Sequence, residues 1–193
     1  MFKNEPLGHE AKLRNAKASF YIGEFDWAVA QLNILKSATS QFIANDAMYL
    51  SLLITDNTIM DTTTQALEMF ASADLLFFQN KVDSALSKLD SINALFPTHQ
   101  LTDDILYKKA EIWSKRGEYE KAAGYLQKVI EGYEQEILGD DALFMLAEIY
   151  DYRLKDKMQA MQLYQDLLIN HPGSLYTVEA RKRYRQLRGD NIN

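Results

Sequence analysis

The residues that most often carry out catalysis are sparse in this sequence. His9, His99 and His171 lie far apart, and none has the two-histidine spacing on one helix face that zinc enzymes use. There is no cysteine, which excludes disulfides, thiol nucleophiles and cysteine-bound zinc. The sequence also lacks a phosphate-binding loop, a dinucleotide fingerprint and a serine-nucleophile motif. We therefore expect the histidines to be surface loop residues, and we expect no cofactor and no metal.

Two pairs of adjacent carboxylates are the remaining candidates for metal or acid–base chemistry. They are Asp103-Asp104 and Asp140-Asp141, and each pair falls at the start of an expected helix. Carboxylates at that position accept hydrogen bonds from free backbone N–H groups and interact favourably with the helix dipole. Capping explains both pairs without catalysis, so the sequence predicts a protein that is not an enzyme.

The elements that carry these residues repeat along the chain. The stretch KRGEYEKAAGYLQKVI (115–130) has counterparts in YIGEFDWAVAQLNIL (21–35), FQNKVDSALSKLDSI (78–92) and RLKDKMQAMQLYQDLL (153–168). Gly117 interrupts a helical pattern of apolar residues, which predicts two amphipathic helices joined by a tight turn. Alanines flank each turn twelve residues apart in three copies and thirteen apart in the fourth, where we place one extra residue in the turn at 155–157: Ala16 and Ala28, Ala73 and Ala85, Ala110 and Ala122, Ala147 and Ala160.

The spacing between copies is also regular. Ala73, Ala110 and Ala147 follow one another at 37 residues, and a fixed period of this size indicates stacked helical hairpins. Pro97 and Pro172 each stand twelve residues after the second alanine of a copy, where proline is expected to end the second helix.

This pattern resembles the tetratricopeptide repeat (TPR) family, in a bacterial-type protein or a fragment of one. The fourth copy shows the family's large, small and aromatic positions most fully, at Leu143, Leu146, Ala147, Tyr150, Ala160, Tyr164 and Pro172. Ser72 and Lys109 depart from the family pattern, and the period exceeds the family's usual 34 residues by three. The resemblance implies an all-α, right-handed, TPR-like superhelix of stacked antiparallel helical hairpins, about ten helices with a C-terminal capping helix.

We predict a single solenoid over residues 1–193, with repeats near 7–40, 63–97, 101–135 and 139–172. The irregular insert at 41–62 is expected to hold a lone helix at 44–55 and a loop at 56–62, after which Thr62 and Gln65 form a capping box. The cap helix is expected at 174–189. It would cover the last hairpin with Leu175, Val178, Tyr184 and Leu187 and keep its basic residues in water: Arg181, Lys182, Arg183, Arg185 and Arg188.

The resemblance also implies a partner-binding groove, because the first helices of TPR hairpins commonly line a concave surface that receives a peptide or a helix. Asp74, Glu111 and Glu148 take equivalent places, 37 residues apart, and a row of carboxylates would attract a basic partner. The equal alternative is a solvated face whose acids pair with nearby lysines. The groove residues carried over are Phe70, Asp74, Phe77, Phe78, Tyr107, Glu111, Lys115, Phe144, Glu148, Asp151 and Tyr152.

The sequence thus favours a non-catalytic scaffold that binds a basic and apolar protein segment. The alternatives are a structural spacer within a larger bacterial cell-envelope repeat protein and an enzyme whose site lies at the 56–62 loop. The basic terminal helix suggests nucleic acid or acidic lipid, but the net charge of −6 and the lack of a base-stacking platform beside the basic cluster argue against it. No apolar run reaches membrane-spanning length and no signal core is present, so we expect a soluble chain, in the cytoplasm or, if Met1 begins an excised piece, in the bacterial envelope.

Overall fold

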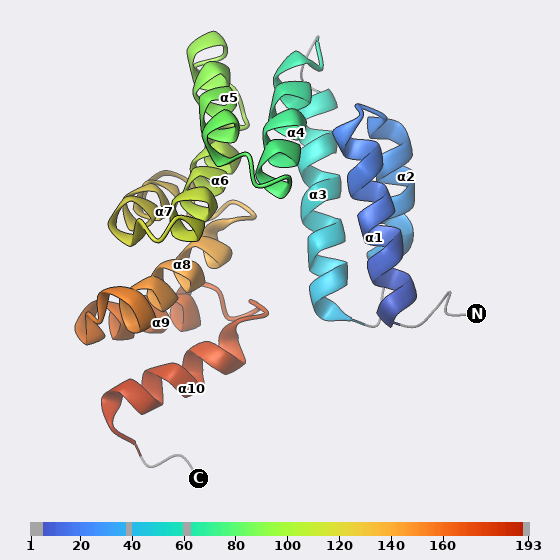
Figure 1. Ribbon diagram of the computed structural model, residues 1–193. Coiled ribbons are helices and arrows are strands. Elements are labelled where there is room, and N and C mark those ends of the chain that lie inside the picture. Colours follow the sequence, from blue (N-terminus) through green and yellow to red (C-terminus); the bar gives the residue numbers. More distant parts are fainter. Residues whose placement is uncertain (1–5, 38–39, 60–62, 191–193) are drawn as a thin grey trace. The chain divides into compact units, whose positions relative to one another are not determined.

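The computed structural model describes residues 6–37, 40–59 and 63–190, and these form helices and short connections without any strand. The prediction of an all-α helical repeat fold is confirmed. Figure 1 shows the elements, which are α1 (Pro6–Tyr21), α2 (Phe25–Leu35), α3 (Gln41–Ile59), α4 (Gln65–Phe78), α5 (Val82–Leu95), α6 (Thr102–Lys115), α7 (Tyr119–Tyr133), α8 (Gly139–Glu148), the π-helical segment η1 (Ile149–Leu154), α9 (Lys157–Asn170) and α10 (Thr177–Arg188).

The chain divides into two compact units, which are described separately below. Unit 1 is Met1–Thr102 and contains α1 to α5, and unit 2 is Asp103–Asn193 and contains α6 to α10. In unit 1, α1 packs against α2, α3 and α4, and α4 packs against α5. In unit 2, α8 packs against α7 and α9, and α9 packs against α10.

The paired alanines are buried near the turn of every hairpin. All eight are 0% exposed, and each pair joins the two helices of one hairpin: α1 with α2, α4 with α5, α6 with α7, and α8 with α9. A methyl side chain at the contact lets the two backbones approach closely, and the larger apolar residues fill the space on either side. The spacing in the sequence therefore predicted the helix pairs and the burial of the alanines.

The four hairpin turns share one backbone motif. The first helix ends with a residue in the left-handed conformation, at Gly23 (φ 80°), Asn80 (φ 62°), Gly117 (φ 79°) and Lys155 (φ 61°). The N–H of the next residue then bonds back into the last helical turn, as from Glu118 to the Trp113 carbonyl at 3.0 Å. In the first three turns this is a Schellman ending, which satisfies carbonyls that the helix leaves without partners, and in the fourth the Asp156 N–H bonds one residue further back, to the Tyr150 carbonyl at 3.0 Å.

The extra residue of the fourth copy lies in the helix and not in the turn, which corrects the prediction. In every copy the left-handed residue stands five residues before the second alanine, so the turns are equal in length. The added residue lies between Ala147 and Lys155, where the chain forms the π-helical segment η1. A single insertion within an α-helix commonly produces such a segment, and it changes which side chains face the neighbouring helices.

The two predicted proline stops are confirmed. Helix α5 ends at Leu95 and α9 ends at Asn170, two residues before Pro97 and Pro172 respectively. The residues between, Phe96 and His171, leave the helical region, because a proline disfavours helical geometry in the residue before it.

The insert is more helical than the sequence indicated. Helix α3 covers Gln41–Ile59, so the predicted helix at 44–55 exists but continues through residues 56–59, which we had expected to be loop. The remainder of that loop, 60–62, and with it Thr62 of the expected capping box, lies outside the described residues. Helix α4 instead begins after Thr64, whose hydroxyl donates to Glu68 Oε1 at 2.7 Å.

The predicted cap helix is present as α10, with two differences in its contacts. Tyr184 and Leu187 pack against the core of unit 2, as expected, but Val178 is 76% exposed. Arg183 does not stay in water and is described with the site below. Over residues 6–37, 40–59 and 63–190, no helix is both long enough and apolar enough to span a membrane.

Candidate functional site

The eleven predicted groove residues fall in both units. Four lie on α4 in unit 1, and seven lie on α6, α8 and η1 in unit 2. Each group is therefore described within its own unit.

In unit 1 the predicted residues differ widely in exposure. Phe70 is 1% exposed and belongs to the core, which corrects its assignment to the groove: it shares a helix face with Ala66 and Ala73, both fully buried. Phe78, at the end of α4, is 76% exposed. Phe77 is half-buried, and the Asp74 carboxylate accepts a hydrogen bond from the Tyr21 hydroxyl of α1 at 3.1 Å.

In unit 2 a first group of residues forms an acidic-aromatic cluster around Tyr107 of α6. Burial raises the pKa of the Tyr107 phenol well above its usual value, and the nearby Glu111 and Asp141 raise it further. The phenol therefore stays protonated and can donate a hydrogen bond. Tyr176 donates its own hydroxyl hydrogen to Asp141, and its ring stacks on Phe144 with centroids 4.3 Å apart.

Some charges of this face are paired within the chain. Glu111 forms an ion pair with Lys108 at 2.6 Å, one turn earlier on α6. Lys115, the last residue of α6, is exposed. Pairing of an acid with a neighbouring lysine is the arrangement expected for a solvated face, so Glu111 alone does not identify a binding surface.

A second group of residues lies around Glu148 at the end of α8. The carboxylate is half-buried, and its pKa is raised by burial first and then by the nearby Glu179 and Asp151, with Arg183 opposing the rise. It opens on a pocket of about 250 Å³ whose lining residues are Ser114, Met145, Glu148, Ile149, Tyr152 and Arg153. A partly desolvated carboxylate among other acids gains more from an added cation than a fully hydrated one does.

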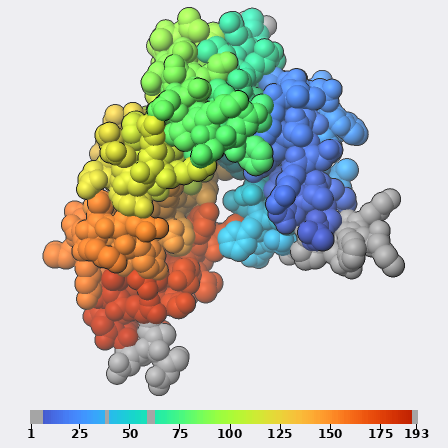
Figure 2. Space-filling view, in the orientation of Figure 1, coloured from blue at the N-terminus to red at the C-terminus, as the bar shows by residue number. Residues whose placement is uncertain are grey.

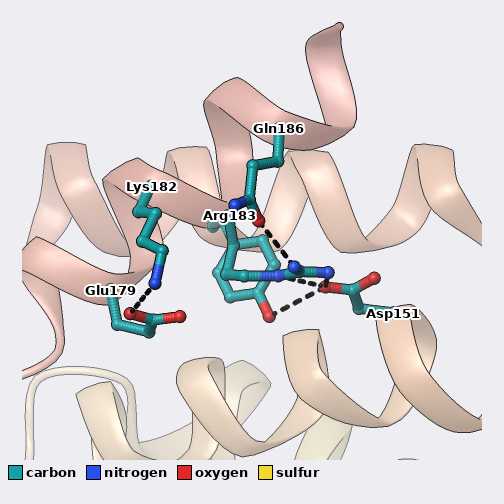
Figure 3. Close-up of polar contacts among 6 residues, drawn as sticks. Asp151, Glu179, Lys182, Arg183 and Gln186 are labelled. Carbon is teal, nitrogen blue, oxygen red and sulfur yellow. Dashed lines mark hydrogen bonds and ion pairs between the residues drawn. The ribbon is translucent and has the colours of Figure 1, made fainter. Parts of the chain in front are cut away.

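The π-helical η1 positions the rest of this site. Asp151 Oδ2 accepts hydrogen bonds from Arg183 Nε at 2.9 Å and from Arg183 Nη2 at 2.6 Å, as Figure 3 shows. The Tyr164 hydroxyl donates to the same oxygen at 3.4 Å, and the Arg183 guanidinium lies over the Tyr152 ring, 4.7 Å from its centre. Arg183 thus ties α10 to η1, which corrects the expectation that it is solvated.

Asp151 acts here as a positioning residue. Its side chain is only 6% exposed and is occupied by Arg183, so the predicted direct contact between Asp151 and a partner is wrong. Tyr152 remains 41% exposed beside the pocket. Figure 3 also shows Glu179 paired with Lys182 at 3.5 Å and Gln186 accepting from Arg183 Nη1 at 2.6 Å.

Sequence reasoning missed the contribution of α10 and the loop before it. Tyr176, Glu179 and Arg183 all take part in the two groups, although the sequence suggested only a solvating cap. Nothing in the spacing links Arg183 to Asp151, 32 residues earlier. The available signal was the thirteen-residue alanine spacing, which marked the fourth first helix as irregular.

The residues first considered for catalysis are spread over separate elements. His99 Nδ1 accepts the N–H of Leu101 at 3.2 Å, and His171 lies 3.8 Å from Glu134. The carboxylate pairs sit in the first turns of α6 and α8, as predicted, and Asp140 accepts the N–H of Asp141 at 3.0 Å. Within the part of the chain that the structure describes, no three His, Asp or Glu side chains are grouped so as to hold a metal ion.

Comparison with known proteins supports the repeat assignment. Residues 104–135 and 141–174 each match the family model of the tetratricopeptide repeat, and these ranges correspond to the α6–α7 and α8–α9 hairpins. The predicted resemblance to the TPR family is thereby confirmed. No curated protein matches the chain.

A solved structure has a similar fold. It is the crystal structure of a tetratricopeptide repeat protein from Parabacteroides merdae ATCC 43184, with a TM-score of 0.55 and 16% sequence identity over 94% of this chain. The chain spans 60% of the length of that protein. At this identity the likeness concerns the fold. Tetratricopeptide repeats generally mediate protein–protein interaction and are generally non-catalytic.

Proposed function

We propose that this chain, whose residues 104–135 and 141–174 are tetratricopeptide repeats, is a non-catalytic interaction scaffold that binds a partner segment with basic and apolar side chains on unit 2. One observation carries the proposal. Glu148 is a half-buried carboxylate close to Glu179 and Asp151, and it lines a mixed pocket in which Met145, Ile149 and Tyr152 are the apolar side chains and Ser114 and Arg153 the other polar ones. A lysine or arginine side chain entering this pocket would relieve the repulsion between Glu148, Glu179 and Asp151.

The surroundings of Glu148 supply the apolar part of the recognition. Met145 and Tyr152 line the same pocket. Phe144, one helical turn before Glu148 on α8, stacks its ring on that of Tyr176. Aromatic rings held in place by packing offer contact area at little loss of side-chain entropy. Tyr107 and Glu111 of α6 extend this face within unit 2.

The proposal is tested by panning phage-displayed random dodecapeptides against the chain and two charge-reversal variants. We expect the unchanged chain to enrich peptides that carry Lys or Arg beside an aromatic or aliphatic residue, and Glu148→Lys to lose that enrichment. Glu131→Lys makes the same charge change at an exposed position of α7 and should keep it. Enrichment that lacks basic sequences from the unchanged chain, or full retention of the basic sequences by Glu148→Lys, would contradict the proposal, and no enrichment by any form would favour the structural-spacer hypothesis.

Binding to this site should depend on pH with a defined sign. Because the pKa of Glu148 is raised in the free protein, part of the population is protonated in the range just above the usual value of 4.5. A basic peptide stabilises the charged form, so its affinity should rise as pH increases through that range and then level off. Titration calorimetry of an enriched peptide across this range should show the rise for the unchanged chain and a much flatter profile for Glu148→Gln.

A further inference from the structure

Unit 1 contains a second pocket, which the proposed function does not use. It lies between α1 and α4, has a volume of about 540 Å³, and is lined by Arg14, Lys17, Ala18, Tyr21, Leu75 and Phe78. The surfaces of these two helices meet in Figure 2, where α1 is blue and α4 is blue-green to green. The volume is sufficient for one or two large side chains of a partner.

The walls of this pocket are apolar and partly fixed. The Tyr21 ring is held through its hydroxyl by Asp74 at 3.1 Å and packs against Phe20, with ring centres 5.9 Å apart. On the other side stands Phe78, 76% exposed, with its ring centre 6.4 Å from that of Tyr21. A phenylalanine this exposed at the mouth of a pocket has apolar surface that a partner could cover.

The charge at the rim is positive. Arg14 and Lys17 stand three residues apart on one face of α1, and among the lining residues that the structure describes they are the charged ones. Arg14 pairs with Glu10 at 2.5 Å, but both side chains are exposed, and a pair of that kind contributes little stability. Lys17 is half-buried and forms no ion pair with any described residue.

We propose that this pocket binds a protein segment in which a carboxylate stands beside an aromatic or branched aliphatic side chain. The apolar side chain would lie between Tyr21, Leu75 and Phe78. The carboxylate would pair with Lys17 and share the Arg14 guanidinium, whose planar fork suits a carboxylate. The charge preference is opposite to that of the Glu148 pocket in unit 2, so the two sites select different sequences and each can be tested without the other.

The test uses the whole chain, labelled with ¹⁵N, and three synthetic hexapeptides titrated under NMR observation. The probes share a central Phe-Leu pair, which is flanked by Asp, Asn or Lys. We expect the Asp peptide to shift the amide signals around Lys17, Tyr21 and Phe78. It should bind at least about fivefold more tightly than the Asn peptide, and the Lys peptide should bind more weakly still.

Variants then separate this pocket from other surfaces. Lys17→Glu and Phe78→Ala should each weaken the Asp peptide about fivefold or more. Lys36→Glu, an exposed site at the end of α2, should leave it unchanged. Equal binding of the Asp and Lys peptides, an undiminished affinity in Lys17→Glu, or shifts that arise from protein concentration alone through self-association would each overturn the proposal.

Discussion

Units 1 and 2 are built from the same hairpin but bury different kinds of polar group. Among the described residues, the buried polar side chains of unit 1 are uncharged, whereas those of unit 2 are all charged: Ser19, Ser51 and Asn57 in the first, and Asp103, Asp104, Lys109 and Asp151 in the second. In the sequence of unit 1, the long helix α3 lies between the two hairpins, and its Leu50, Leu53 and Ile54 are buried.

Unit 2 places its hairpins in direct succession. Unit 2 can thus hold a charged group between its elements where the packing brings it to a partner, as it brings Asp151 to Arg183. A single added helix is more easily accommodated by apolar packing, which does not depend on direction. Unit 2 should therefore be the more sensitive of the two to single substitutions at contacts between elements.

The connection between the hairpins of unit 2 requires glycine at position 139. A Cβ added there would lie 1.8 Å from the Glu134 carbonyl oxygen, and that atom belongs to the backbone. The substitution Gly139→Ala should lower the free energy of unfolding of unit 2 by about 3 kcal/mol, because the connection must shift and repack. Hydrogen exchange followed by mass spectrometry should show faster exchange in α7, α8 and α9 and little change in α1 to α3.

The control for this prediction is Gly124→Ala on α7. A Cβ added at Gly124 meets nothing within 4 Å, so the same chemical change should leave exchange unaltered or slow it, since alanine favours a helix by about 1 kcal/mol over glycine. Equal effects of the two substitutions would show that the connection does not depend on close backbone approach.

The ion pair between Asp151 and Arg183 is the next contact to break. Removing the arginine leaves the Asp151 carboxylate nearly buried, with only the long hydrogen bond from Tyr164. We expect Arg183→Met to destabilise unit 2 by about 2 kcal/mol, less than a fully buried pair would lose because Arg183 is 21% exposed. Exchange should rise first in α10.

Arg188→Met, on the same helix, provides the matched comparison. Arg188 pairs with Asp190 in water, with 54% of its side chain exposed, so its loss should leave the free energy of unfolding nearly unchanged. If Arg183→Met changed the free energy of unfolding as little as Arg188→Met, the buried ion pair of unit 2 would contribute little to its stability. The expected difference in sensitivity between the two units would then be wrong.

Much of the fold could be predicted because a few residue types report local geometry. A small residue at constant spacing marks the contact of two helices, and all eight alanines so identified are fully buried. Proline marks the end of a helix for a steric reason that does not depend on tertiary context, as at Pro97 and Pro172. Gly23 and Gly117 likewise indicated two turns in the sequence. Asn80 and Lys155 adopt the same left-handed conformation, but without a glycine the sequence held no sign of it.

The candidate sites were less predictable because their residues depend on contacts between distant elements. Two adjacent aromatic residues differ in exposure: Phe20 is 1% exposed, while its neighbour Tyr21 lines a pocket. The sequence alone does not distinguish them, because both are aromatic residues of the same helix. Phe70 was misplaced for the same reason. Arg183 looked like a solvated cation until its partner on η1 was placed.

The smallest predicted effect concerns the turn motif that the two units share. Lys155 in unit 2 and Asn80 in unit 1 hold the left-handed position with φ near 61° and 62°. That conformation costs an ordinary side chain about 1–2 kcal/mol, whereas asparagine tolerates it better and glycine adopts it freely. After allowing for the greater freedom of glycine in the unfolded chain, Lys155→Gly should stabilise unit 2 by about 0.5 kcal/mol, and Asn80→Gly should leave unit 1 nearly unchanged.

The opposite change, from glycine to a residue with a Cβ, can be made at the equivalent position of another turn. Gly117 holds the same position with φ 79°, so Gly117→Ala should destabilise unit 2 by about 1 kcal/mol, measured like the others by the exchange of amides in the adjoining helices. If Lys155→Gly were instead destabilising, the lysine side chain would be making a contact that offsets its backbone strain. The fourth hairpin would then differ from the other three both in its first helix, which contains the extra residue at η1, and in its turn, where Lys155 would make a side-chain contact.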